Sequence, residues 1–305
     1  MGDVIVKGLS LAAIVLLGYG LKRLGWVRAE HFSVLSIIVL RVTLPAALIS
    51  SFNTVDITAT MVWLIVIGLA VNLIRQGFTW LTTRHRSPAE RSFAILHSGS
   101  YNVGAFAMPY TAQLAGPTAM VYTAMFDIGN SITAGGIGYG WGMMTARGQR
   151  VRIGRFLLTM LHSPVFIVYV ALMTLRLAHL SLPDQVITFT SLVGQANPFC
   201  AMLMIGVGLE LNLPRAVWAA AGRALLERYL FVIAFCLVIW FLIPSSVLSV
   251  DAKTILVVVL WAPIAVMVAG FVDEAHGDVR LASLMSSISV IIAVVMMPAM
   301  FLVLR

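Results

Sequence analysis

The chain has 305 residues, of which 60% are hydrophobic and only 10% are charged, and its formal net charge is +8. A soluble domain carries about 25% charged residues, so this composition excludes a soluble protein and predicts an integral membrane protein. The basic excess lies in short loops between apolar runs, so it indicates membrane topology and not binding of nucleic acid.

The first apolar run extends from Val4 to Gly20, and its basic residues, Lys22 and Arg23, come after it. A cleavable signal peptide would carry its basic residues before the apolar run. We therefore expect a retained first span whose N-terminus lies outside the cytoplasm.

Apolar runs and breaks predict ten membrane spans, because a spanning helix needs roughly 20 apolar residues. No connection between these spans is long enough for a soluble domain. The expected spans lie at about 4–20, 32–52, 57–81, 91–114, 117–143, 156–178, 185–211, 224–243, 253–274 and 279–304.

Lysine and arginine are distributed very unevenly between the two sides of these spans. When the sides alternate along the chain, one receives only Lys7, Arg176, Lys253 and Arg305. Because basic residues favour the cytoplasmic side, we expect a plasma (inner) membrane protein with both termini on the non-cytoplasmic side. The other fifteen are Lys22, Arg23, Arg28, Arg75, Arg84, Arg86, Arg91, Arg147, Arg150, Arg152, Arg155, Arg215, Arg223, Arg228 and Arg280.

Helix breakers recur at corresponding places in two halves of the chain, residues 1–143 and 156–305. Pro45 lies near the middle of the second span, and Pro198 lies near the middle of the seventh. Asn102 in the fourth span and Pro263 in the ninth each stand fourteen residues before a glycine, at positions 116 and 277. Two units of five helices have opposite orientations in the membrane. The sequence therefore predicts an all-α membrane protein with two inverted five-helix repeats, in which broken helices 4 and 9 cross.

The fourth span, ILHSGSYNVGAFAMPYTAQLAG, holds residues that weaken a helix. Gly99 and Gly104 lower helix stability, and Pro109 lacks a backbone donor. Irregular backbone at membrane depth survives only where protein or water satisfies it. One interpretation is a substrate site at a helix break, with Asn102 presenting its amide. The alternative is a proline-kinked helix whose small residues allow close packing.

The fifth span carries a polar stripe with a carboxylate at its centre. Thr123, Asp127, Asn130 and Ser131 follow helical spacing and share one face. An ionisable residue inside a span indicates function by default, so Asp127 with Asn130 is a candidate proton-coupling site. A structural Asp127, hydrogen-bonded to the neighbouring broken span, is the alternative. Both interpretations place Asp127 near Asn102.

Spans two and seven supply further candidates for the site. Arg41 lies inside span two, where an arginine costs about 2.5–3.5 kcal/mol, so we expect it to pair with an anionic substrate or with Asp127. The equivalent residue in the second half is Gly194. Gln195 and Asn197 could line the site from span seven, and packing hydrogen bonds explain them equally well.

The sequence contains no motif of a nucleotide-driven pump, an enzyme or a potassium filter. No GxxxxGK[ST], GxSxG, HExxH, CxxC or TVGYG pattern occurs. Cys200 and Cys236 both lie in apolar runs and are interpreted as small buried apolar residues. We therefore expect neither an enzyme nor a bound metal or other cofactor.

Four stretches together resemble a bacterial member of the auxin efflux carrier family. They are residues 99–104 with Pro109, residues 116–119 and 126–130, the run from Pro198 to Leu209, and Trp261–Pro263 with Leu281–Ser283. The resemblance implies the ten-helix crossover fold of bile acid sodium symporters, with helices 4 and 9 crossing near Asn102 and Pro263. It also implies a scaffold of helices 1, 2, 6 and 7, a transport unit of helices 3–5 and 8–10, and a homodimer.

The family resemblance further implies an organic-anion substrate, such as auxin in plants or a malonate- or malate-like acid in bacteria. The long central loop of many plant carriers is missing here, and so is their Asn-Pro-Asn stretch, which argues against auxin itself. We expect a secondary active transporter of a small organic carboxylate, working by alternating access and coupled to protons. The alternatives are a sodium-coupled symporter, a passive channel and a membrane sensor.

Overall fold

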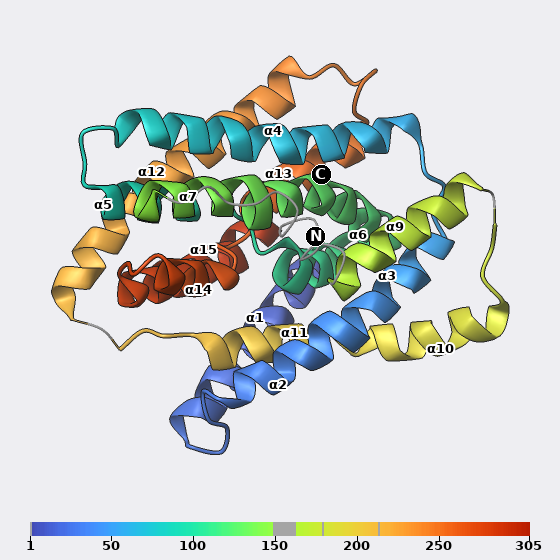
Figure 1. The fold of residues 1–305 in the computed structure, drawn as a ribbon. Helices are drawn as coiled ribbons and strands as arrows, with labels where there is room; N and C mark the ends of the chain where they lie inside the picture. The colour runs from blue at the N-terminus through green and yellow to red at the C-terminus, as the bar shows by residue number, and fades with distance from the viewer. Residues whose placement is uncertain (1, 149–162, 179, 213) are drawn as a thin grey trace.

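The computed structural model describes residues 2–148, 163–178, 180–212 and 214–305. Throughout these ranges the chain forms helices joined by turns and short loops, and no β-strand occurs in them (Figure 1). The expected all-α fold class is therefore confirmed. The beginning of the expected sixth span, residues 156–162, lies outside the described residues, as do three of the basic residues assigned to the cytoplasmic side.

The first half of the chain forms seven α-helices and three short π-helical segments, described within residues 2–148. The segments are α1 (Gly2–Arg23), α2 (His31–Ile38), η1 (Val39–Thr43), α3 (Leu44–Asn53), α4 (Ala59–Thr82), α5 (Pro88–Ser98), η2 (Val103–Ala107), α6 (Met108–Ile132), η3 (Thr133–Ile137) and α7 (Gly138–Arg147).

The second half continues in the same style over the ranges described from residue 163 onward. Its segments are α9 (Pro164–Leu177), α10 (Asp184–Gln195), α11 (Asn197–Gly208), α12 (Arg215–Leu237), η4 (Val238–Leu242), α13 (Val250–Leu260), α14 (Met267–Glu274) and α15 (Val279–Val303).

Within the described ranges, six helical segments are long and apolar enough to cross a membrane, which makes the chain a multi-pass membrane protein. They are Gly2–Arg23, His31–Asn53, Thr60–Thr82, Asp184–Gly208, Val217–Leu242 and Val279–Val303. The shorter apolar helix α9 falls in the expected sixth span. The expected fourth, fifth and ninth spans are not among the six segments, and the fourth and ninth are interrupted helices. The total of ten spans therefore stays a prediction.

Mid-span prolines and one glycine divide the expected spans into shorter helices. Pro45 follows η1 and Pro109 follows η2, so each proline lies in the first turn of a new helix, where its missing N–H is tolerated. Gly116 has a φ of +80° and bends α6 sharply, at the turn expected between spans four and five. In the matching turn after α14, positive φ falls on His276 (+56°), one residue before the expected Gly277.

Glycines let neighbouring helices approach one another closely. Helix α11 packs along α1, α10 along α3, and α4 along α6 (Figure 1). A methyl group at Gly206 would collide with the backbone of Val15 in α1, and one at Gly194 would lie 2.7 Å from Ala47 Cα in α3. Small residues at helix contacts are typical of membrane proteins, where tight packing replaces the hydrophobic effect.

The contact between α4 and α6 gives a matched test of this packing. At Gly68 a methyl group would collide with the Phe126 carbonyl oxygen, whereas at Gly77, on the same helix, it would meet nothing within 4 Å. We expect Gly68→Ala to lower the free energy of unfolding by about 1–3 kcal/mol through overpacking. We expect Gly77→Ala to leave it unchanged or raise it slightly, since alanine favours helix. Thermal unfolding in detergent compares the two; equal midpoints would contradict the role of Gly68.

Candidate functional site

Two interrupted helices meet inside the molecule. One interruption covers residues 99–102, between α5 and η2, and the other covers residues 261–266, between α13 and α14. The backbone N–H of Asn102 donates a hydrogen bond to the carbonyl oxygen of Pro263 over 2.8 Å. The structure thus joins the two interruptions at the two residues around which the sequence predicted a crossing.

Asn130 supplies the hydrogen bonds that the first interruption has lost. Its amide oxygen accepts from the Tyr101 N–H (3.2 Å), and its amide nitrogen donates to the Tyr101 carbonyl (3.1 Å). Asn72 of α4 donates to the same amide oxygen over 3.0 Å, which fixes its orientation. On the far interruption, Ser289 of α15 accepts from the Ile264 N–H over 2.9 Å. Side chains therefore replace helix hydrogen bonds on both interrupted segments.

Asp127 lies beside the first interruption, as the sequence led us to expect. One carboxylate oxygen accepts from the Asn130 amide (2.9 Å), and the other accepts from the Tyr169 hydroxyl (2.8 Å). A methyl group at Gly104 would lie 3.7 Å from the second oxygen, so the carboxylate is close to the irregular backbone. Because Tyr169 comes from α9, Asp127 connects α9 with α6.

Arg228 of α12 was not identified as a site residue from the sequence. It was counted as a cytoplasmic loop charge, but the structure buries it, with 1% of its surface exposed. Its guanidinium donates to the Ser100 carbonyl (3.3 Å) and to the Ala262 carbonyl (3.2 Å), so it contacts both interruptions. The usable signal was its place inside the expected eighth span, 224–243, which the structure extends back to Arg215 as α12.

Two other basic residues assigned to loops by the sequence are also buried. Arg75 lies within α4 with 6% of its surface exposed, and Lys253 lies in the first turn of α13, also 6% exposed. These positions correct the count of loop charges. The bias toward the predicted cytoplasmic side remains without Arg75 and Arg228.

A cavity of about 800 Å³ extends from the predicted cytoplasmic surface to Ser98 and Arg228, next to the interruptions. Arg75, His97, Ser98 and Arg228 are buried members of its wall, and each is at most 6% exposed. Exposed residues at its mouth include Arg86, Glu90, Arg223, Glu227, His276 and Asp278. Within the described ranges, no three His, Cys, Asp or Glu side chains are grouped to hold a metal ion.

Three residues predicted for the site line a second, smaller cavity of about 210 Å³. Pro109, Gln195 and Asn197 meet there, between α6 and the junction of α10 with α11. Asn197 is buried and accepts a hydrogen bond from Thr43 over 2.9 Å, which is the packing role considered for it. Arg41 is exposed on η1 and lines neither cavity. The structure does not pair it with Asp127, whose carboxylate bonds to Asn130 and Tyr169.

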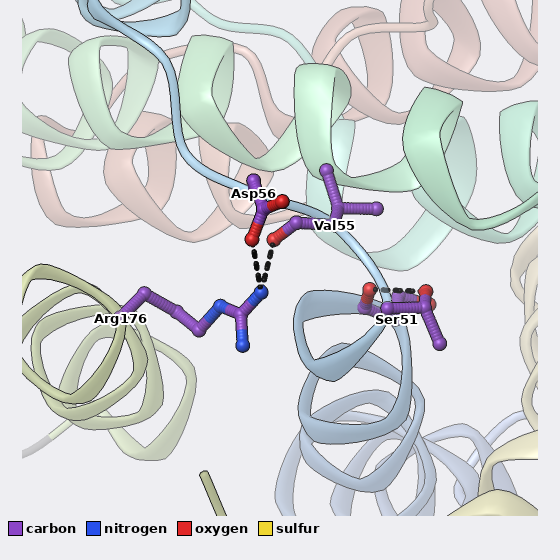
Figure 2. Close-up of polar contacts among 5 residues, drawn as sticks. Ser51, Val55, Asp56 and Arg176 are labelled. Atoms are coloured by element: carbon purple, nitrogen blue, oxygen red, sulfur yellow. Dashed lines mark hydrogen bonds and ion pairs between the residues drawn. The ribbon is translucent and has the colours of Figure 1, made fainter. Parts of the chain in front are cut away.

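Arg176, one of the four basic residues predicted outside, ties α9 to the turn between α3 and α4. Its guanidinium donates to the Val55 carbonyl over 3.0 Å and pairs with Asp56 over 2.9 Å (Figure 2). Asp56 is fully exposed, and such pairs contribute about 0–1 kcal/mol. The charge therefore has a local structural role at this end of the molecule.

Comparison with known protein families gives one finding. The family model described as membrane transport protein matches residues 3–163, which is more than half of the chain. The match includes the first interruption, Asp127 and Asn130. No curated protein matches the chain.

We expect Asn130→Ala to destabilise the protein, because it leaves both Tyr101 backbone groups buried without partners. Each unsatisfied group costs about 1–3 kcal/mol. Ser131→Ala, at the neighbouring residue, is the control and should have little effect. The thermal unfolding midpoint of each variant in detergent checks this. A midpoint for Asn130→Ala equal to that of the wild type would show that the interruption does not depend on this amide.

Proposed function

This chain belongs to the auxin efflux carrier family of membrane transport proteins, and we propose that it is a secondary active transporter for a small organic anion. It moves its substrate by alternating access, and it is not an enzyme. A malonate- or malate-like carboxylate fits this proposal better than auxin itself.

One observation carries the proposal: two interrupted helices meet, and two separate cavities lie near them. The larger cavity reaches Ser98 and Arg228, next to the interruptions, and the smaller one lies against α6 at Pro109. Among the described residues, none lines both cavities. A crossing of interrupted helices with separate cavities near it suits a carrier, because a modest movement can open one cavity as it closes the other.

Two similar units support an inverted-repeat plan. Each unit has a helix, an interruption, a short helix and a turn with positive φ, at Gly116 in the first and His276 in the second. In this plan α1, α2–α3, α9 and α10–α11 form the scaffold, and the remaining helices form the transport unit. Both termini then lie on the non-cytoplasmic side of the inner membrane, and the scaffolds form the contact of a homodimer.

The charge of the larger cavity favours an anionic substrate. Its lining contains four arginines, Arg75, Arg86, Arg223 and Arg228, against three acids, and the acids Glu90, Glu227 and Asp278 are exposed. Among the described residues of the wall, the two charged side chains that are buried, Arg75 and Arg228, are both positive. A carboxylate is the organic anion whose geometry matches the guanidinium fork.

We expect Asn102→Ala to reduce transport about tenfold, because the protein loses one side-chain hydrogen bond to the substrate. The substitution keeps the backbone bond from residue 102 to Pro263, so it removes only the side-chain amide, whose nitrogen is buried without a partner. Gln185→Ala, at an exposed position of α10, is the control. Uptake of radiolabelled malonate into proteoliposomes measures both; equal rates for Asn102→Ala and wild type would refute a substrate role for Asn102.

Counterflow in the same proteoliposomes separates a carrier from the channel alternative. Unlabelled carboxylate inside the vesicles should accelerate uptake of labelled carboxylate, and the rate should saturate. Linear flux without this acceleration would indicate a passive channel. Replacing sodium by choline tests the sodium-coupled alternative, for which uptake would stop.

Asp127 is the proposed proton-coupling residue, and Asp127→Asn tests it. The amide keeps an acceptor for the Tyr169 hydroxyl but cannot change its charge. We expect carboxylate exchange to continue in this variant while stimulation of uptake by an imposed pH gradient disappears. Asp184→Asn, at an exposed position of α10, should keep full stimulation. If Asp127→Asn also keeps it, Asp127 serves only as a structural acceptor.

A further inference from the structure

The guanidinium of Arg228 lies among acceptors that are weak for a buried charge. Its hydrogen bonds to the Ser100 and Ala262 carbonyls are long, at 3.2–3.3 Å, and its Nε has no partner. The Tyr101 ring lies 4.6 Å from its central carbon, which adds a cation–π contact. Both carbonyls follow helix C-termini, α5 and α13, where a cation is favoured by the helix dipole. Arg228 is thus held in place as a cap for two helix ends.

Arg75 is a second buried guanidinium in the same wall, and it has no equivalent support. One of its terminal nitrogens, Nη1, has no hydrogen-bond partner. It interacts with the Tyr101 side chain and is repelled by Arg228. Over the described part of the chain, neither guanidinium forms an ion pair with a carboxylate. Glu227, an exposed residue of the same cavity, attracts Arg75 but forms no ion pair with it, and the repulsion between the two buried guanidiniums destabilises the empty protein.

A charge count shows how much negative charge the site lacks. Each helix C-terminus contributes about −0.5 elementary charge, so the ends of α5 and α13 together offset about one of the two guanidinium charges. Neither helix end bonds to Arg75, so its guanidinium keeps a positive charge that the carboxylate group of a ligand can pair with.

Neutral polar atoms in the cavity wall and in the first interruption are also unsatisfied. His97 lines the cavity, and its Nδ1 contacts the Phe93 carbonyl, but its Nε2 has no partner. In the interruption, next to the cavity, the amide nitrogen of Asn102 and the hydroxyl of Ser100 are likewise buried and unpaired. Buried polar atoms are nearly always hydrogen-bonded, so these atoms, together with the unpaired Nη1 of Arg75, indicate a missing polar ligand.

We propose that Arg75 binds one carboxylate group of the substrate at the deep end of the larger cavity, while Arg228 positions the two interrupted helices around it. This inference rests on the proposed transport function and identifies the side chain that binds the substrate. Arg75 is the binding residue and Arg228 is the positioning residue. The two arginines consequently have opposite effects on the empty protein.

Thermal unfolding of the purified, ligand-free protein in detergent tests that difference. Arg75→Gln removes an uncompensated charge, so the midpoint should rise by about 2 °C or more, whereas Arg228→Gln should lower it because two helix ends lose their cap. Arg84→Gln, an exposed charge just beyond α4, is the control and should leave the midpoint unchanged. A fall for Arg75→Gln as large as that for Arg228→Gln would overturn the proposal, because it would make Arg75 a structural residue.

Binding is measured by titrating carboxylates against the neutral amides of the same shape, following the midpoint. The probes are acetate with acetamide, malonate with malonamide, and indole-3-acetate with indole-3-acetamide, and inorganic phosphate is added as a different anion. We expect at least one carboxylate to stabilise the wild type while its amide does not. The apparent affinity should fall at least about tenfold in Arg75→Gln, recover in part in Arg75→Lys, and stay unchanged in Arg84→Gln.

The possible outcomes separate this proposal from the transport function. If Arg75→Gln binds the carboxylate as tightly as wild type and wild type still shows counterflow, the binding residue is wrong and the transporter proposal stands. If phosphate alone stabilises the protein, or no carboxylate does, the carboxylate site is overturned. If the wild type shows no counterflow of any anion, the transport function itself fails.

Discussion

An interrupted helix inside a membrane protein must find new partners for its backbone, and that constraint organises the centre of this molecule. Lipid offers no hydrogen bonds, so an unpaired N–H or C=O at this depth costs several kcal/mol. The chain meets the constraint by placing two interruptions together, with the Asn102 N–H donating to the Pro263 carbonyl. Each interrupted segment thereby satisfies part of the backbone of the other.

The remaining backbone groups are satisfied by side chains from surrounding helices, and this is why polar residues concentrate at one point. Asn130 pairs with both backbone groups of Tyr101, Ser289 accepts from Ile264, and Arg228 donates to carbonyls on both interruptions. Glycines at other helix contacts, such as Gly68, Gly194 and Gly206, instead allow close packing. The structural requirement for hydrogen bonds and the chemical requirement for a polar site are therefore met by the same residues.

Local features of the fold were predictable from the sequence because they have local causes. Glycine and proline mark the interruptions and the Gly116 turn, and hydropathy marks the long spans. The position of Asp127 beside Asn102 followed from helical spacing. The roles of Arg75 and Arg228 did not, because an arginine near the end of an apolar run resembles a topology signal until the helix geometry is known. The reverse holds for Arg41, which lies inside an apolar run but on an exposed face of η1.

The hydrogen bonds at the crossing also indicate what a movement between states has to break. In the proposed division, the bonds of Asn102, Asn130 and Arg228 to the interruptions all lie within the transport unit, so this unit carries its own backbone partners as it moves. The bond from Tyr169 to Asp127 is different, since it joins scaffold helix α9 to transport helix α6. A change in charge at Asp127 acts directly on that bond. In the proposed mechanism, protonation of Asp127 and movement of the transport unit are linked through this one contact, while the hydrogen bonds of the crossing are kept.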